Sequence, residues 1–221
     1  MNRTGQDYAT EPRIVVLATR NRGKLRELEA MLVGLPVRVQ TLDDYPDIPI
    51  LPEIGDTFED NAKSKARNVA WLTGHIALAD DSGLEVDMLG RAPGVNSATF
   101  LGPTATDEDR NAWVLGKVRG MEEGLRTARY RAVVAVATSG GTVRTFEGTC
   151  EGRIADGPRG HEGFGYDPIF FVPAYGRTMG ELPPEIKNQI SHRARALAAA
   201  RDYLVSLITS AGGSSAPSSA P

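Results

Sequence analysis

The spacing of apolar residues predicts that strands and helices alternate along most of the chain. The apolar run IVVL is short and continuous, which indicates a buried strand over residues 13–19. Beyond it, Leu25, Leu28 and Leu32 recur at helical spacing and predict a helix over 22–33. The same criteria predict a strand at 37–40, a helix at 58–73, strands at 76–79 and 84–87, a helix at 106–119, a strand at 169–172, and a last helix that begins between 184 and 191 and ends near 208.

A long hairpin is expected in the second half of the chain. The runs RYRAVVAVATS and TVRTFEGTCEGRI are rich in β-branched and aromatic residues, and Gly140-Gly141 separates them. Between the two short strands that precede it, Ser82 and Gly83 are expected to form a turn after Asp80 and Asp81. Strand-helix alternation combined with a hairpin predicts an α/β fold with a mixed sheet and helices on its faces.

Length and composition favour a single domain with loose ends. The chain has 221 residues, of which 41% are hydrophobic, and we expect one domain over 13–208. Residues 1–12 lack any period, and 209–221 are a low-complexity Ser/Ala/Gly/Pro segment, so both are expected to be flexible tails.

Charge and cysteine content exclude several classes of protein. A net charge of −3 disfavours a nucleic-acid partner, which usually needs a basic face. The single cysteine, Cys150, excludes an intramolecular disulfide and indicates a reducing compartment; it is itself expected to be a small buried hydrophobe. The sequence contains neither an apolar run of about 18 residues nor a signal-peptide pattern, so we expect no membrane association and a cytoplasmic location.

A cluster of positive charge directly follows the first predicted strand. Four basic residues lie within seven positions there: Arg20, Arg22, Lys24 and Arg26. A strand that enters a helix through such a segment directs backbone N–H groups, the helix dipole and cationic side chains at one point, which favours an anion site and most simply a phosphate site. The alternative is a solvated basic helix face.

Two adjacent carboxylates, Asp80 and Asp81, end an apolar run. Such neighbours raise one another's pKa unless a cation compensates, so the pair predicts a Mg2+ site. Because side chains alternate along a strand, only one of the two is expected to face the ligand. Glu53, in an acidic loop, can supply a second metal ligand, although the residues alone do not single it out. The alternative is a plain Asp-Ser-Gly turn.

Two later stretches combine groups suited to binding a nucleotide base and phosphate. In GPRGHEGFGYDPIFFVP, glycines permit close approach of a ligand and the aromatic residues offer stacking surfaces; the alternative is an ordinary Gly-rich connection. In ELPPEIKNQISHRARAL, Lys187, His192 and Arg193 are hydrogen-bond donors near the start of the last helix, with Ser191 as its cap. A structural histidine is the alternative for His192. The three histidines lack metal-ligand spacing, which argues against zinc.

Taken together, these stretches resemble the inosine triphosphate pyrophosphatase family. The matching segments occur in the family's order and cover about residues 14–204: TRNRGK, FEDNA, ADDSGLEVDMLGRAPGVNSA, GFGYDPIFFVP and ELPPEIKNQISHRARAL. The chain departs from the pattern at Asn96 and Thr99, where the family usually has Tyr and Arg, which affects only contacts of those two side chains. The resemblance implies an elongated, two-lobed α/β molecule with the active site in the cleft between lobes, usually a homodimer.

The resemblance also implies a role for individual residues. Asp81 would be the catalytic proton acceptor, and Glu53 and Asp81 would bind the metal. The residues expected to bind substrate are Thr19, Arg20, Asn21, Arg22, Gly23, Lys24, Ser82, Phe164, Gly165, Tyr166, Asp167, Lys187, His192 and Arg193.

The implied reaction is hydrolysis of ITP, dITP and XTP to the nucleoside monophosphate and pyrophosphate, which removes deaminated purines from the nucleotide pool. Three alternatives are open. A Maf-type nucleotide pyrophosphatase would have another specificity, but the intact SHR and GFGYDP segments argue against it. A non-catalytic nucleotide sensor is expected to lack the carboxylates. A phosphatase with a covalent aspartyl intermediate would need Asp-x-Asp after a buried strand, which is absent.

Overall fold

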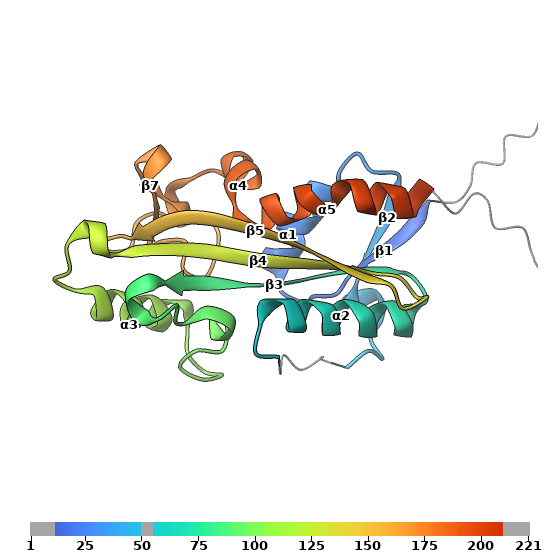
Figure 1. Cartoon of the computed structure of the whole chain (residues 1–221), viewed down its shortest axis with the longest axis horizontal. Coiled ribbons are helices and arrows are strands. Elements are labelled where there is room, and N and C mark those ends of the chain that lie inside the picture. Colours follow the sequence, from blue (N-terminus) through green and yellow to red (C-terminus); the bar gives the residue numbers. More distant parts are fainter. Residues whose placement is uncertain (1–11, 50–54, 210–221) are drawn as a thin grey trace, which may run out of the picture.

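Seven strands form one mixed sheet that runs the length of the molecule (Figure 1). The computed structural model describes residues 12–49 and 55–209, so both predicted tails, apart from their innermost residues, and Glu53 lie outside the described part. The strand order is β2-β1-β3-β4-β5-β6-β7, with β1 parallel to both β2 and β3 and the remaining pairs antiparallel. The predicted mixed α/β sheet is therefore confirmed.

Apart from β3 and the last helical region, the elements begin and end close to the predicted positions. The strands are β1 (Arg13–Leu17), β2 (Val37–Thr41), β3 (Ile76–Val86), β4 (Thr127–Ala137), β5 (Val143–Ile154), β6 (Phe170–Val172) and β7 (Arg177–Thr178). The α-helices are α1 (Arg22–Leu32), α2 (Phe58–Thr73), α3 (Asp107–Val118), α4 (Pro184–Ile190) and α5 (His192–Thr209). Helix α2 is capped by Thr57, whose side chain accepts a hydrogen bond from the Asp60 N–H.

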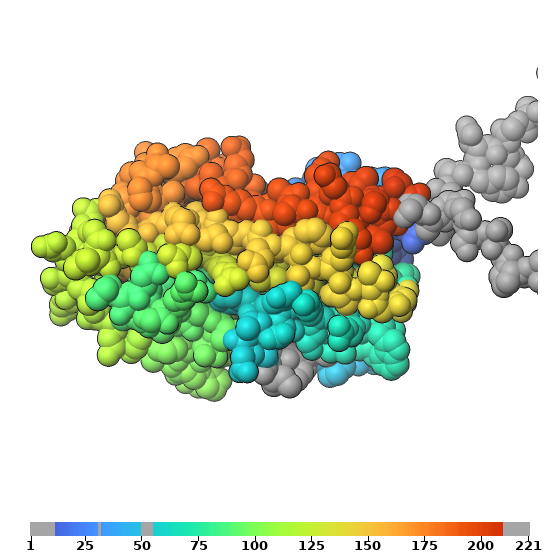
Figure 2. All heavy atoms as spheres, viewed as in Figure 1, coloured from blue at the N-terminus to red at the C-terminus, as the bar shows by residue number. Residues whose placement is uncertain are grey.

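Alternation along β4 divides the core between two faces of the sheet. Val133 and Ala135 pack with α2 on one face, whereas Val134 and Val136 pack with α1 and α5 on the other. A third apolar cluster, at the far end of the sheet, joins α3 to β6. In the space-filling view, α5 (red) lies alongside the β4–β5 hairpin (yellow) (Figure 2).

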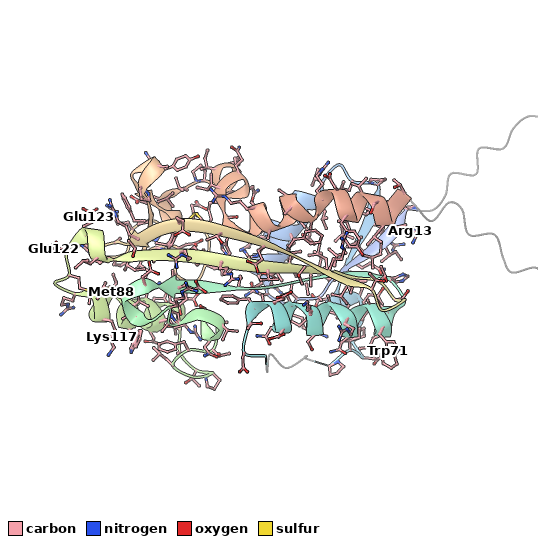
Figure 3. The ribbon with its side chains drawn as sticks, viewed as in Figure 1. Arg13, Trp71, Met88, Lys117, Glu122 and Glu123 are labelled. Carbon is pink, nitrogen blue, oxygen red and sulfur yellow. The ribbon has the colours of Figure 1, made fainter. Side chains whose placement is uncertain are left out.

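Exposed side chains lie near both ends of the long sheet. Trp71, which is 75% exposed, lies on α2 near one end, and Glu122 and Glu123 lie at the other (Figure 3). Within the described residues, no helix is long and apolar enough to cross a membrane.

The predicted turn at Ser82-Gly83 is wrong, because both residues belong to the continuous strand β3. Ser82 pairs with Ala132 and Gly83 with Arg131 in the antiparallel ladder with β4. A side chain at Gly83 would collide with Gly94 and Ser97, so glycine serves close packing here and not a turn. The long partner strand offers backbone hydrogen bonds along the whole segment, which outweighs the local turn preference.

The last helical region is broken once instead of forming one helix. Helix α4 ends at Ile190, and Ser191 adopts an extended conformation (φ −65°, ψ 155°) before α5 begins. The Ser191 hydroxyl accepts a hydrogen bond from the Ala194 N–H at 3.1 Å, so its expected role as a cap is confirmed. This break places His192 and Arg193 in the first turn of α5.

Candidate active site

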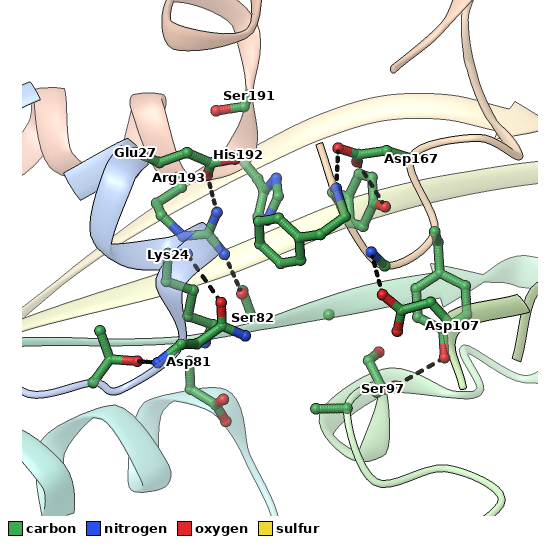
Figure 4. A pocket seen from close by; sticks show the side chains of 18 of the residues that line it. Lys24, Glu27, Asp81, Ser82, Ser97, Asp107, Asp167, Ser191, His192 and Arg193 are labelled. Atoms are coloured by element: carbon green, nitrogen blue, oxygen red, sulfur yellow. Dashed lines mark hydrogen bonds and ion pairs between the residues drawn. The ribbon is translucent and has the colours of Figure 1, made fainter. Parts of the chain in front are cut away.

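A cleft of about 520 Å³ opens where β3 extends beyond the end of β1. The register joins the two strands only as far as the Leu17–Leu78 pair, after which the chain turns into α1. The edge of β3 from Asp80 onward is therefore accessible from the carboxyl end of β1, which is a common place for a ligand in α/β sheets. The cleft is lined by residues of α1, α2, β3, α3, the loop before β6, α4 and α5 (Figure 4).

The first turn of α1 is capped by the protein itself. The Asn21 side chain accepts hydrogen bonds from the Gly23 and Lys24 N–H groups at 2.9 and 3.1 Å. These two N–H groups are therefore not free to bind a ligand. The sequence pattern, by contrast, predicts that backbone N–H groups of this segment point at an anion. Thr19, Arg20, Asn21 and Lys24 line the cleft, whereas Arg22 is exposed and lies outside the lining.

Asp80 points toward α1 and α5. Its Oδ2 lies 3.2 Å from the Lys24 Nζ and accepts a hydrogen bond from the Arg193 Nε at 3.0 Å. Burial alone would raise the pKa of the Asp80 carboxyl, but Lys24, Arg193 and Lys65 outweigh it and hold that pKa well below its usual range. For Asp80, side chains of the protein therefore supply the compensating positive charge that the adjacent carboxylates were expected to need.

Asp81 points to the opposite face of the sheet, toward α2. Its Oδ2 accepts a hydrogen bond from the Asn61 Nδ2 at 2.9 Å, and its Oδ1 lies 3.6 Å from the Lys65 Nζ. Lys65 also donates to the Asp80 carbonyl oxygen at 2.7 Å. The expected alternation is confirmed, since of the two aspartates only Asp81 lines the cleft.

Arg193 connects three elements at the centre of the site. Its Nη2 donates to the Ser82 Oγ at 3.0 Å, and its Nη1 donates to Glu27 of α1 (Figure 4). Its Nε donates to Asp80. Burial would lower the pKa of the guanidinium, but Asp80 and Glu27 raise it, so the side chain is a permanent cation. Arg193 therefore neutralises Asp80 and orients Ser82.

The loop before β6 forms an aromatic wall next to α1. Gly163 and Gly165, with φ of +91° and +64°, flank Phe164. A Cβ on Gly23 would lie 2.6 Å from Cδ1 of the Phe164 ring, so the ring rests directly on the first turn of α1. The Arg193 guanidinium lies 5.7 Å from the ring centroid, within cation–π range.

Buried polar groups support this wall from behind. Lys187 donates to the Asp167 carboxylate, and the Tyr130 hydroxyl donates to its other oxygen at 3.1 Å. Burial raises the pKa of Asp167, and Lys187 partly offsets the shift. The Tyr130 ring in turn stacks on His192, with ring centroids 4.6 Å apart and planes 11° apart.

His192 is neutral in the folded protein. Burial lowers its pKa well below the usual value, and the adjacent Arg193 adds to the shift. Its Nδ1 is buried and has no hydrogen-bond partner among the residues that the structure describes. His192 lines the cleft, but its Nδ1 is not on the accessible surface of the cleft.

Of the two residues expected to bind a metal, Asp81 and Glu53, only Asp81 lies in the part of the chain that the structure describes. Asp81 presents a carboxylate in the cleft, and carboxylate oxygen is the ligand type that hard divalent cations prefer. Residues 12–49 and 55–209 contain no group of three His, Cys, Asp or Glu side chains arranged for a metal. The other expected metal ligand, Glu53, lies outside these ranges. Of the two expected ligands, Asp81 is therefore the one whose carboxylate can be seen to fit a divalent cation.

Several residues of the site were not predicted from the sequence. Lys65 and Asn61 are four positions apart on α2, and Glu27 is three positions after Lys24 on α1, so helical spacing from the recognised segments could have indicated them. No local signal points to Tyr130. Other polar side chains of the cleft that were not predicted include Ser97, Asp107 and Arg110.

The fold and site define an α/β protein whose cleft joins cationic and carboxylate side chains to an aromatic wall. Comparison with known proteins assigns its family. The model of the Ham1 family matches residues 15–203, and the chain therefore belongs to that family. A dITP/XTP pyrophosphatase of Geobacter sulfurreducens is 52% identical over 190 residues, covering 86% of this chain and 96% of the relative. The relative of the same name from Desulforamulus reducens is 47% identical, with 86% and 94% covered.

A solved structure agrees with this assignment. The HAM1 protein of Coxiella burnetii is 40% identical and superposes with a TM-score of 0.78, covering 90% of this chain and all of that one. Similarity over nearly the full length of both chains means that the two proteins share one fold.

Proposed function

We propose that this protein hydrolyses the nonstandard purine nucleoside triphosphates ITP, dITP and XTP to the monophosphate and pyrophosphate. The observation that carries the proposal is the cleft itself, which joins lysines, a carboxylate and an aromatic wall in one space of about 520 Å³. Relatives about 50% identical to the chain are dITP/XTP pyrophosphatases, and membership of the Ham1 family disfavours a Maf-type activity.

The triphosphate binds at the cationic end of the cleft. Lys24 and Lys65 reach it from α1 and α2, from opposite faces of the sheet, so they can contact phosphate oxygens from two sides. Burial lowers the pKa of Lys24, while Asp80 opposes the shift and favours its charged form. Ser82, whose hydroxyl is oriented by Arg193, contributes a polar contact beside them.

Asp81 accepts the proton of the attacking water. Its carboxylate lies in the cleft, and Asn61 fixes its orientation through the 2.9 Å hydrogen bond. Water attacks the α-phosphorus, the bond to the bridging oxygen breaks, and pyrophosphate leaves toward the lysines. A divalent cation, for which we propose Mg2+ bound by Asp81 and Glu53, would supply charge stabilisation on the phosphate oxygens.

The base binds against Phe164, with His192 reading its six-position. Inosine and xanthosine carry an acceptor carbonyl there, whereas adenosine carries a donor amine. His192 lines the cleft, and a neutral imidazole can donate one ring N–H to such a carbonyl. A site that requires such a bond discriminates by a factor on the order of 10^4 when the partner is wrong. Each of the three guanidinium nitrogens of Arg193 donates a hydrogen bond to a protein oxygen. Arg193 therefore supports the Phe164 ring next to it.

Pyrophosphate release from ITP, XTP, GTP and ATP tests the proposal. We expect release that requires Mg2+, stops with EDTA, and strongly favours ITP and XTP. Asp81→Asn should lose most of its turnover, whereas the exposed control Asp202→Asn should keep it. Tight nucleotide binding without release would instead identify a sensor. Homodimerisation, a single domain over 13–208 and a cytoplasmic location stay predictions.

A further inference from the structure

Two side chains of α3 hold the backbone of a single residue in the aromatic wall. The Asp107 Oδ2 accepts a hydrogen bond from the Gly165 N–H at 2.8 Å, and the Asn111 Nδ2 donates to the Gly165 carbonyl oxygen at 3.1 Å. Residues four apart lie on the same face of a helix, so one face of α3 engages both polar groups of Gly165. Figure 4 shows the Asp107 contact at the side of the cleft opposite Glu27.

The held residue is next to Phe164, at a point where the backbone has unusual freedom. Gly163 and Gly165 both have positive φ, and glycine crosses between backbone regions at little cost. The orientation of the Phe164 ring therefore depends on contacts that fix these glycines. Asp167 makes two longer bonds with this tripeptide: its carboxylate accepts from the Phe164 N–H at 3.4 Å, and its own N–H donates to the Phe164 carbonyl oxygen at 3.3 Å. Among the described residues, the two shorter hydrogen bonds on the tripeptide come from α3.

Stability alone does not account for the two side chains. The Asp107 side chain is 48% exposed, where hydrogen bonds and ion pairs contribute little to folding. Asn111 is buried, yet its Oδ1 has no partner among the described residues. A buried amide with one unsatisfied end is a poor choice for a core, since an apolar side chain of similar size would be nearly neutral or better.

We propose that Asp107 and Asn111 are positioning residues that set purine selectivity by fixing Phe164. The inference rests on the proposed function, because it assumes that the base stacks on this ring. Without either bond, the wall samples orientations that no longer align the base with His192. The phosphate end of the cleft, formed by α1, α2 and β3, does not depend on α3 contacts.

Steady-state kinetics of Asp107→Ala and Asn111→Ala tests the proposal. We expect the KM for ITP to rise about three- to tenfold for each variant, which corresponds to one lost hydrogen bond, with little change in kcat. The ITP/ATP ratio of kcat/KM should fall. Inhibition by inorganic triphosphate should not change, because that anion binds at the phosphate end of the cleft, which does not depend on α3 contacts.

Matched variants separate positioning from a general effect on α3. Asp107→Asn keeps an oxygen acceptor and should restore the wild-type KM. Glu108→Ala removes an exposed acid from the same helical turn and should have no effect. Unchanged KM and selectivity with a lowered Tm would overturn the proposal and leave only a structural role.

The failure of the proposed function would look different from the failure of this inference. Wild-type protein that releases no pyrophosphate from ITP would contradict the proposed reaction. In that case, calorimetric Kd values for ITP and inorganic triphosphate still decide the inference. A loss of ITP affinity alone in the α3 variants supports it, and equal affinities in wild type and variants refute it.

Discussion

Replacing Arg193 with methionine is expected to destabilise the fold strongly. Arg193 is 2% exposed and donates to Asp80, whose side chain is fully buried, over 3.0 Å. Methionine keeps much of the apolar volume but removes the charge and all three hydrogen bonds. Asp80 would then rely on Lys24, at 3.2 Å, and on Lys65.

Breaking a buried ion pair by removing one partner costs about 3–5 kcal/mol, because the other charge stays buried without compensation. Since Lys24 remains next to Asp80, we expect Arg193→Met to lower the free energy of unfolding by about 3 kcal/mol, the lower end of that range. Arg193→Lys should lose less, because it keeps a charge but not the planar fork that reaches Asp80 and Ser82 together.

Urea unfolding of a double-mutant cycle measures this coupling. Asp80→Asn removes the charge that Arg193 compensates, so the double variant should be more stable than the sum of the single losses predicts, by at least about 1.5 kcal/mol. Arg201→Met, an exposed arginine on the same helix, should change stability by less than about 0.5 kcal/mol. Additive losses, or a loss below about 1 kcal/mol for Arg193→Met, would refute the reasoning.

Three further predictions concern two glycines and the effect of pH. Gly116→Ala in α3 should raise the free energy of unfolding by about 0.5–1 kcal/mol, since nothing lies within 4 Å of the new Cβ. Gly23→Ala should instead displace Phe164, because the new Cβ would lie 2.6 Å from its ring, and raise the KM for ITP; an unchanged KM would contradict the contact. Stability should fall as pH drops below the usual histidine value of 6.5, because the unfolded chain protonates His192 while burial and the cations Arg193, Lys24 and Lys187, opposed by Asp80, keep it neutral in the fold. The His192 contribution to the slope is at most about 1.4 kcal/mol per pH unit, and His192→Gln should lose it in urea titrations at pH 5 to 7.5; equal slopes would show that His192 is not the titrating group.

The elements of the fold could be predicted where local pattern and tertiary packing agree. Three local features occur where the pattern indicates. They are the apolar stripe of α1, the glycine with positive φ that ends α2 (Gly74), and the hairpin at Gly140-Gly141. At Ser82-Gly83 the two levels disagree. Turn-forming residues there are held in a strand by pairing with β4, and Gly83 is required by Ser97, which no window of sequence around it reveals.

The sequence by itself determined which chemical groups this protein brings to a ligand. The segments that match the family in order supply Lys24 and Lys187, the Asp80-Asp81 pair, Phe164 between glycines, and His192 with Arg193. It also determined that the two aspartates point apart, because side chains alternate along any strand.

Only the tertiary structure decided how those groups are paired. Arg193 compensates Asp80 across 113 positions of sequence, and Tyr130 joins His192 to Asp167. Asn111 reaches Gly165 across 54 positions. The physical reason is that buried charges and amides must find partners in three dimensions, and these partners come from whichever elements the sheet brings into contact.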